Sequence, residues 1–257
     1  MILEGFVKSC LFWEQMIVSA GSGFQKWIDS ADAWIVAQGI EGDWSRRAVV
    51  DPALESILEN VRGRKVLDLG CGEGRYSRIL NAKGAVVTGI DPVPKFIERA
   101  RALDQDSNYV EGTAESLCFP DEYFDIVLSY LSFVDIEGLK DAASEIVRVL
   151  RRGGKLVIVS ISNVASTSTG WVKDESGNKK HRVVDRYMDE LAIELELKGV
   201  RVTNYHRPLS YTLGLFLGQG FVLSRFEEPL PDAADPKYDD ERRVPTFQIL
   251  CLDKATW

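Results

Sequence analysis

Three glycines at alternate positions follow directly on a short apolar run. Val66-Leu67-Asp68-Leu69 leads into Gly70-Cys71-Gly72-Glu73-Gly74, and the residues after this segment favour a helix. Glycine permits the positive φ angles of a tight turn and lets the backbone come close to a ligand. The N–H groups at the start of the helix then face that ligand as donors. This turn therefore predicts a binding site for a small ligand where a strand meets a helix.

Asp68 lies two residues before Gly70 and sets the charge of that site. A dinucleotide-binding turn has the spacing G-x-G-x-x-G and holds a pyrophosphate at the start of the helix. The spacing here is G-x-G-x-G, and a carboxylate at Asp68 would repel a pyrophosphate. The same carboxylate suits a ligand with a cationic end, such as the amino and sulfonium groups of S-adenosylmethionine. The sign of the charge favours this ligand over a dinucleotide.

Asp91 is a second carboxylate at the expected end of a strand, 21 residues after Gly70. A carboxylate at that edge of a sheet can accept hydrogen bonds from both hydroxyls of a ribose. Because all adenosine-containing cofactors share this requirement, Asp91 predicts nucleoside binding without choosing between them. The alternative is a solvated turn aspartate in front of Pro92.

Short apolar runs alternate with helical patterns from residue 64 onwards. We expect helices over 76–83, 94–102, 139–150 and 208–218, and strands over 65–69, 85–90, 109–111, 124–130, 155–161, 221–227 and 246–252. Short buried strands that alternate with helices are typical of a parallel sheet covered on both faces. The sequence therefore predicts an α/β fold.

The chain divides into four segments on the same grounds. Residues 1–44 carry apolar side chains at helical spacing and are expected to form two helices, divided at Gly21-Ser22-Gly23. These helices can cover the mouth of the site as a lid, pack on the core, or form the surface of a homodimer. Residues 45–161 form the binding core, and 208–257 complete it.

Residues 162–207 interrupt the alternation and are expected to form a cap insertion over the core. A stretch rich in Ser, Thr and Gly over 162–177 opens it, and we expect a helix over 184–197 and a strand over 200–205.

Five motifs occur in the order found in the class I S-adenosylmethionine-dependent methyltransferases, and the chain resembles that family over residues 45–160. They are residues 66–77 (VLDLGCGEGRYS), Ile90-Asp91, residues 112–117 (GTAESL) before Phe119-Pro120, residues 124–127 (FDIV) and residues 148–154 (RVLRRGG). The resemblance implies a doubly wound, mostly parallel seven-stranded sheet whose last strand is antiparallel. It also implies S-adenosyl-L-methionine as cofactor.

The resemblance assigns a part of that cofactor to each matching residue. The methionine half would meet Asp68, Gly70, Cys71, Gly72, Ser129 and Tyr130, the ribose Asp91, and the adenine Pro92, Val93, Thr113, Ala114 and Glu115. Many members carry an aspartate where this chain has Thr113, which puts a side-chain contact to the adenine amino group in doubt. Arg46, before the core, can pair with the cofactor carboxylate through a charge-assisted contact; a surface arginine is the simpler alternative.

Methyl transfer is an in-line displacement, so the protein must align the nucleophile, exclude water and in some cases remove a proton. His206 is the candidate catalytic base, because it lies where a strand meets the next helix and an imidazole titrates near neutral pH. The alternative is a structural histidine that fixes this junction. His181, the second of the two histidines, lies in a polar stretch and is expected to be solvated.

The composition of the chain excludes several classes of binding partner. The net charge is −8 and basic residues do not cluster beyond pairs, which argues against nucleic acid and anionic membranes. The four cysteines are scattered without metal-ligand spacing, so no metal site is expected, and free thiols favour a cytoplasmic setting. The apolar N-terminus is interrupted by charges and is expected to be soluble.

The sequence as a whole predicts a methyltransferase acting on O, N or C of a small-molecule acceptor, of apolar or aromatic character. Two alternatives stay open at this point. One is a nicotinamide-dependent oxidoreductase, and the other is a protein that binds the cofactor without turnover.

Overall fold

A seven-stranded sheet forms the centre of the computed structural model, which describes residues 23–231, 238 and 242–256. Its strands are β1 (Lys65–Leu69), β2 (Val86–Asp91), β3 (Asn108–Glu111), β4 (Phe124–Tyr130), β5 (Leu150–Ile161), β10 (Phe221–Glu227) and β11 (Phe247–Lys254). The strand order is β10-β11-β5-β4-β1-β2-β3. Strands β1 to β5 pair in parallel, whereas β11 runs antiparallel to both β5 and β10. The predicted fold class is confirmed.

The strand order reverses beside β1. The chain moves from β1 outward to β2 and β3, and then returns to place β4 on the other side of β1. In open α/β sheets, ligands bind at the carboxyl ends of the strands where the order reverses in this way. The topology therefore places a ligand site at the ends of β1, β2 and β4, which is where the glycine turn lies.

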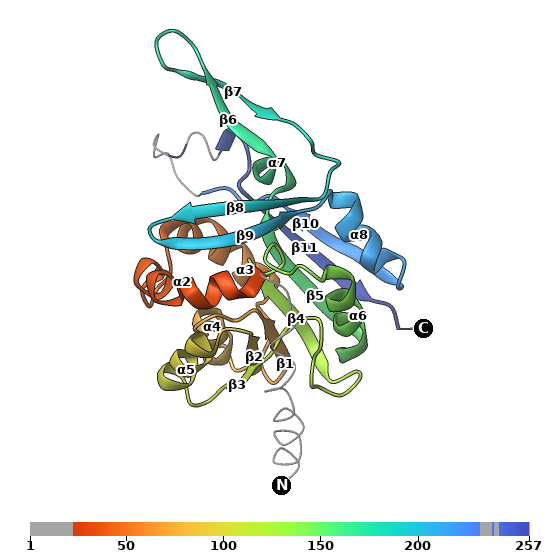
Figure 1. Ribbon diagram of the computed structural model, residues 1–257. Helices are drawn as coiled ribbons and strands as arrows, with labels where there is room; N and C mark the ends of the chain where they lie inside the picture. Colours follow the sequence, from red (N-terminus) through yellow and green to blue (C-terminus); the bar gives the residue numbers. More distant parts are fainter. Residues whose placement is uncertain (1–22, 232–237, 239–241, 257) are drawn as a thin grey trace.

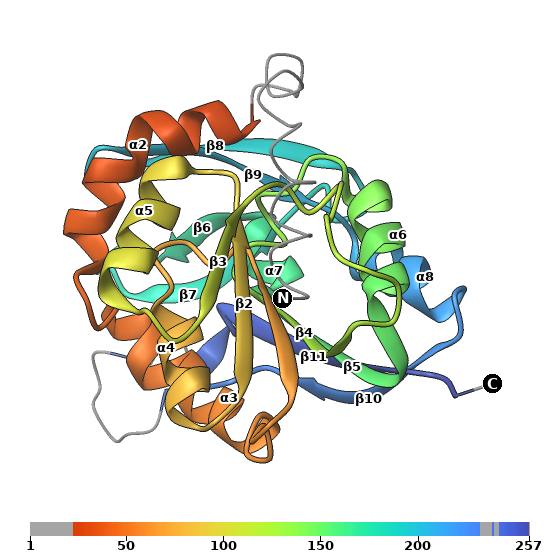
Figure 2. The ribbon, with the colours of Figure 1, turned by 90° about the horizontal axis from the view of Figure 1, so that it is seen from below.

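Helices cover both faces of the sheet (Figure 2). They include α3 (Asp51–Ile57), α4 (Arg75–Ala82), α5 (Pro94–Leu103), α6 (Leu139–Val149) and α8 (Leu209–Leu217). On β1, Val66 packs in a cluster with Leu80 of α4, whereas Leu67 packs in the opposite cluster with Ile146 of α6 and Phe216 of α8. Successive strand residues point to opposite faces. Burial of both faces explains why these strands are continuous apolar runs.

Further elements lie beyond the carboxyl end of the sheet. They are α2 (Gly23–Gln38), η3 (Arg46–Val50), α7 (Asn163–Ser166) and two antiparallel hairpins, β6 (Ser168–Lys173) with β7 (Lys179–Val184) and β8 (Leu191–Leu197) with β9 (Val200–His206). In Figure 1 the β8–β9 hairpin lies across the end of the sheet, whereas the β6–β7 hairpin projects away from it. The hydroxyl of Ser30 in α2 donates to the carbonyl of Arg201 in β9 at 2.9 Å, and the N–H of Arg201 donates back at 2.9 Å. Helix α2 and the β8–β9 hairpin therefore join directly.

The expected helix over 184–197 was wrong, because β8 is a strand. Residues 191–197 alternate apolar and polar or small side chains, LAIELEL, which is the period of two that a strand requires. At the hairpin turn, Lys198 and Gly199 both have positive φ values, 53° and 82°, as in a two-residue turn of the type that matches strand twist. Pairing with β9 therefore stabilises residues 191–197 as a strand and not as part of a helix.

The second of the two predicted N-terminal helices is present as α2. The first predicted helix lies outside the described residues. Among the described helices, none is both long enough and apolar enough to span a membrane.

The glycine turn yields a stability prediction. Gly70 has a φ of 72°, and an added Cβ would lie 2.3 Å from Cβ of Ser132, whereas Gly72 has a φ of 55° and open space around that position. We expect Gly70→Ala to lower the free energy of unfolding by about 3 kcal/mol, from backbone strain and overpacking together. Gly72→Ala should lower it by about 1 kcal/mol, from backbone strain alone. Urea unfolding of both variants tests this, and equal losses would contradict it.

Candidate functional site

A cavity of about 780 Å³ lies at the carboxyl ends of β1, β2 and β4. The glycine turn and the loop after β4 form its floor. Helix α2 contributes Trp27 and Trp34 to its roof, and the β8–β9 hairpin contributes Leu195 and Val202. The floor is therefore polar and belongs to the sheet, whereas the roof is mainly apolar and comes from segments outside the sheet.

Backbone hydrogen bonds hold the glycine turn against the end of β2. The N–H groups of Gly70 and Cys71 both donate to the carbonyl of Ile90, at 2.8 and 3.0 Å. The N–H of Gly72 donates to Oδ2 of Asp91 at 2.8 Å. These contacts tie the turn to the strand that carries the second carboxylate, and they leave the space beside Gly72 open to the cavity.

Asp68 is buried at the end of β1, with 1% of its surface exposed. The hydroxyl of Ser77 donates to its Oδ2 at 2.6 Å, while its Oδ1 has no hydrogen-bond partner among the described residues. Burial raises the pKa of Asp68 to about 6. A buried carboxylate oxygen without a partner is costly, and a cationic group in the cavity would offset that cost. The position suits an ammonium group.

Asp91 is also buried, and both of its oxygens are oriented by the backbone. Oδ1 accepts from the N–H of Val93 at 2.9 Å, and Oδ2 accepts from the N–H of Gly72 at 2.8 Å. Burial raises the pKa of Asp91 to about 6. Each carboxylate oxygen has two lone-pair sites, so each can accept one further hydrogen bond. Asp91 can therefore receive the two hydroxyls of a ribose.

The residues that follow β2 and β3 form another part of the cavity wall. All of those predicted for the adenine line it, namely Pro92, Val93, Thr113, Ala114 and Glu115. Phe96 of α5 adds an aromatic side chain that the sequence analysis missed, because the helical pattern of α5 does not show which helical face lies near β2. This part of the cavity can hold a flat ring.

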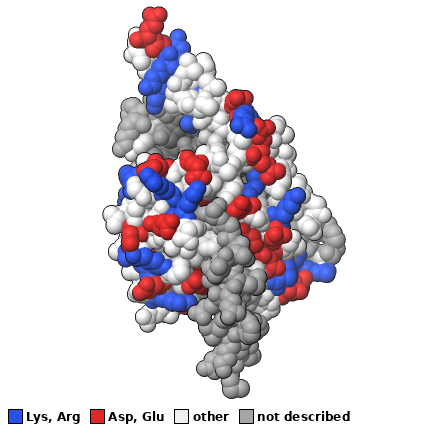
Figure 3. Space-filling model, viewed as in Figure 1, with Lys and Arg blue, Asp and Glu red and all other residues white. Residues whose placement is uncertain are grey.

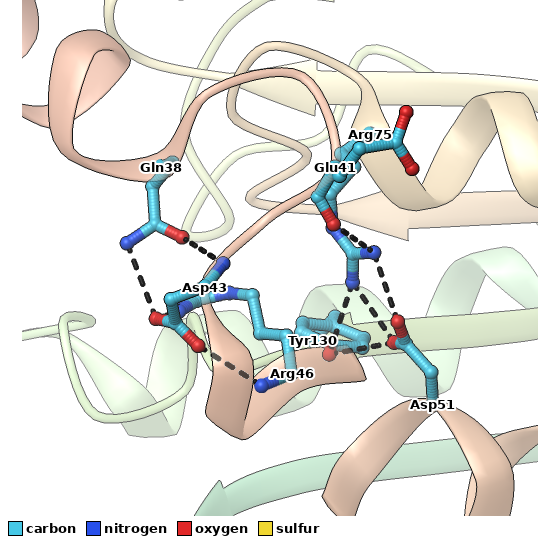
Figure 4. A network of polar contacts seen from close by, with 7 residues as sticks. All are labelled: Gln38, Glu41, Asp43, Arg46, Asp51, Arg75 and Tyr130. Carbon is cyan, nitrogen blue, oxygen red and sulfur yellow. Dashed lines mark hydrogen bonds and ion pairs between the residues drawn. The ribbon is translucent and has the colours of Figure 1, made fainter. Parts of the chain in front are cut away.

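Arg46 lies at the mouth of the cavity beside Asp43 (Figure 4). Its guanidinium forms an ion pair with Asp43, and Gln38 of α2 also donates to that carboxylate, at 3.3 Å. The Arg46 guanidinium also lies over the ring of Trp34, 5.1 Å from its centre. Arg46 therefore lines the cavity as predicted, and its charge is paired with that of Asp43.

Arg75, the first residue of α4, is a second arginine at this mouth that the sequence analysis missed (Figure 4). Its two terminal nitrogens each donate to one oxygen of Asp51, both at 2.9 Å. The hydroxyl of Tyr130 donates to Asp51 at 2.8 Å and accepts from Arg75 at 3.1 Å. The three groups come from three separate elements. No local pattern in the sequence could have identified this network.

Ser129 does not line the cavity, although Tyr130 does. The Ser129 side chain is fully buried, and its hydroxyl lies 2.7 Å from that of Ser132, which donates to the carbonyl of Leu69. Ser132 and Asp135, in the loop after β4, line the cavity instead. Position along β4 alone could not reveal this, because the loop folds back over the strand end.

His206 lies away from this cavity, in the wall of a smaller one of about 250 Å³. Its Nε2 donates to the carbonyl of Tyr187 at 2.9 Å, so the neutral ring has Nδ1 as an acceptor, 2.7 Å from the hydroxyl of Ser166. Both ring nitrogens are thus engaged. This geometry favours the structural alternative, and a catalytic role for His206 stays a prediction. Among the described residues, no group of His, Cys, Asp and Glu side chains could hold a metal ion.

The chain is similar in sequence to known methyltransferases. Residues 67–158 match a family model described as a methyltransferase domain. The malonyl-[acyl-carrier protein] O-methyltransferase of Enterobacter lignolyticus is 30% identical over 58% of this chain, and the demethylmenaquinone methyltransferase of Thermotoga maritima is 34% identical over 49%. The matched regions span only 59% and 54% of those two proteins.

A solved structure extends the similarity over the fold. The S-adenosylmethionine-dependent methyltransferase from Mesorhizobium loti is 26% identical, with a TM-score of 0.71 over 84% of this chain and 100% of that one. Residues 67–158 therefore belong to a methyltransferase domain family, and the sheet that carries them has the class I, Rossmann-like fold of S-adenosylmethionine-dependent methyltransferases.

Proposed function

We propose that the protein transfers the methyl group of S-adenosylmethionine to O, N or C of a small molecule by in-line displacement. The observation that carries this proposal is the buried carboxylate of Asp68, whose Oδ1 lacks a partner beside the glycine turn. A cation in the cavity satisfies that oxygen. Asp91 lies next to the same turn and supplies the acceptor pair that a ribose requires.

The cavity holds residues suited to the amino group, the carboxylate, the ribose and the adenine of this cofactor. Asp68 would accept from its amino group, Asp91 would hold the ribose, and Arg46 would pair with its carboxylate. The flat ring of the adenine would enter the part of the cavity beside Val93 and Phe96. When bound, the cofactor supplies a methyl group on a positively charged sulfur. A pyrophosphate in the same place would lie close to two carboxylates, which disfavours a dinucleotide.

The protein itself would align the acceptor with the methyl group and exclude water from the cavity. We propose that α2 acts as a lid and the β8–β9 hairpin as part of a cap, because both cover the cavity and contact each other. Expelling water from a methyl-transfer site strengthens the electrostatic contacts within it. The apolar side chains of this roof favour a small acceptor of apolar or aromatic character.

The surface supports a small acceptor over a polyanion. Lys, Arg, Asp and Glu side chains are interspersed on the face in Figure 3, without a broad basic field. We propose a cytoplasmic location, which the free thiols of Cys71 and Cys251 support. A homodimer stays a prediction.

Removing the second carboxylate should weaken cofactor binding. We expect Asp91→Ala to lower the affinity for S-adenosylmethionine by about 1–3 kcal/mol, because the ribose hydroxyls lose their buried acceptor. Isothermal titration calorimetry measures this, with Glu98→Ala, at an exposed position on α5, as the matched control. Wild-type affinity in a folded Asp91→Ala variant would count against the assignment, as would tighter binding of NAD than of S-adenosylmethionine by the wild type.

Cofactor binding should depend on pH below neutrality. The pKa values of Asp68 and Asp91 in the free protein are both about 6, raised by burial. The cofactor requires both carboxylates ionised, so binding is strongest well above pH 6 and weakens as pH falls through that value. We expect the dissociation constant to rise about tenfold per pH unit for each group that titrates. Calorimetry from about pH 7.5 to 5 tests this, and the same affinity throughout would be incompatible with it.

The open space beside Gly72 should be essential for the cofactor. An added methyl group there meets no protein atom within 4 Å, so it would project into the cavity. We expect Gly72→Ala to weaken S-adenosylmethionine binding at least about tenfold while the protein stays folded, because the backbone can no longer approach the ligand. Calorimetry together with thermal unfolding separates the two effects. A variant that loses stability and keeps its affinity would argue against this role.

A further inference from the structure

Asp135 is a carboxyl group in the cavity that the cofactor assignment leaves unused. It lies in the loop after β4, where its N–H donates to the carbonyl of Ser132 at 3.0 Å. The amide of Asn204 in β9 donates to its Oδ1 at 2.6 Å. The N–H of Tyr205 also donates to the carbonyl of Val134 at 2.6 Å, which ties the loop to β9. The carboxyl group is thus held in a fixed orientation.

The second oxygen of Asp135 is available to a ligand. Oδ2 makes no hydrogen bond to any residue that the structure describes, and Asp135 lines the cavity together with Asp68 and Asp91. The indole N–H of Trp27 in the roof is buried beside this carboxyl group. An acceptor with a polar group could therefore reach Oδ2 of Asp135 from the cavity.

The surroundings of Asp135 are mainly apolar. Val134 and Ile136 flank it in the loop, and Leu195 and Val202 of the hairpin line the same cavity. This lining suits a ring-sized apolar compound whose single polar group would reach the carboxyl.

The charges in the cavity decide what kind of polar group is acceptable. Burial raises the pKa of Asp135 to about 8; the nearby Trp27 indole N–H, the hydrogen bond from Asn204 and the charge of Arg46 oppose this rise, whereas the charge of Asp91 adds to it. Arg46 is itself paired with Asp43. An anionic acceptor would be repelled by these carboxylates, and a neutral hydroxyl would not.

Building on the proposed function, we propose that Asp135 is the catalytic base and that the acceptor is a ring-sized apolar compound carrying a phenol-type hydroxyl. The O–H bond of the acceptor breaks and its proton moves to Oδ2 of Asp135. An electron pair of the acceptor oxygen forms the new bond to the methyl carbon. The bond from that carbon to the cofactor sulfur breaks, and its electron pair stays on the sulfur, which becomes a neutral thioether. Asp135 then releases the proton to water.

A carboxylate in this environment is a stronger base than one in water. General bases are most effective when their pKa lies near the working pH. Asp135 meets that condition through its burial in the cavity wall, and Asn204 holds it in place. His206, the base predicted from the sequence, has both nitrogens engaged elsewhere.

The test compares two probes of the same shape, 1-naphthol and 1-methylnaphthalene, on protein loaded with S-adenosylhomocysteine. Calorimetry at about pH 8.7, where Asp135 is mostly ionised, should show that 1-naphthol binds at least about tenfold more tightly, because a charged acceptor strengthens the hydrogen bond. The preference should fall to about threefold or less in Asp135→Asn. In the wild type it should fall as pH decreases, with a midpoint near 8.

The control variant is Asp141→Asn, the same chemical change at an exposed position on α6. It should keep the wild-type preference for 1-naphthol. Asp135→Asn should bind S-adenosylhomocysteine within about twofold of the wild type, which shows that the variant is folded and its cofactor site intact.

The two proposals can fail separately. Lack of S-adenosylhomocysteine binding by the wild type would overturn the proposed function. If that ligand binds normally, equal or absent binding of the two probes would overturn the role of Asp135 alone. A preference for 1-naphthol that survives in Asp135→Asn, or that does not depend on pH, would do the same.

Discussion

The hydrogen bond from the N–H of Gly72 to Asp91 connects the two halves of the cofactor site. It joins the glycine turn after β1 to the end of β2, and the N–H groups of Gly70 and Cys71 reinforce it through the carbonyl of Ile90. The turn can adopt this shape because its glycines take positive φ angles. Parallel pairing of β1 with β2 brings both strand ends to one edge. Binding of a nucleoside and of a cationic group therefore depends on one rigid arrangement.

Burial of carboxylates gives the cavity its chemical character. Asp68, Asp91 and Asp135 all have pKa values raised by desolvation, to about 6, 6 and 8. Arg46 and Arg75 also line the cavity, but each is paired with another carboxylate and only partly offsets these raised pKa values. A cavity of this kind favours a cationic cofactor and a neutral acceptor. The same desolvation that costs stability in the free protein supplies affinity when a cation enters.

The roof of the cavity shows how segments distant in sequence create a site together. Helix α2 precedes the sheet and the β8–β9 hairpin follows β5, yet Ser30 and Arg201 bond to each other through two hydrogen bonds. The floor is set by the geometry of a parallel sheet edge, which many ligands can use. The apolar side chains above it come from these two added segments. In the proposed function, the roof would therefore select the acceptor and the floor would recognise the cofactor.

The central sheet, the glycine turn and the two carboxylates near the ends of β1 and β2 could be predicted from the sequence. These features rest on local patterns, since apolar runs, glycine spacing and strand-end aspartates act within a few residues of each other. Tertiary structure alone decided the rest. It showed that 191–197 is a strand, that Arg75 pairs with Asp51, and that Asp135 rather than His206 faces the cavity. The strand at 191–197 pairs with its neighbour β9 across a two-residue turn, and its alternation has the period of a strand. Arg75 and Asp135 instead depend on partners far away in the chain, and local propensity carries no information about such partners.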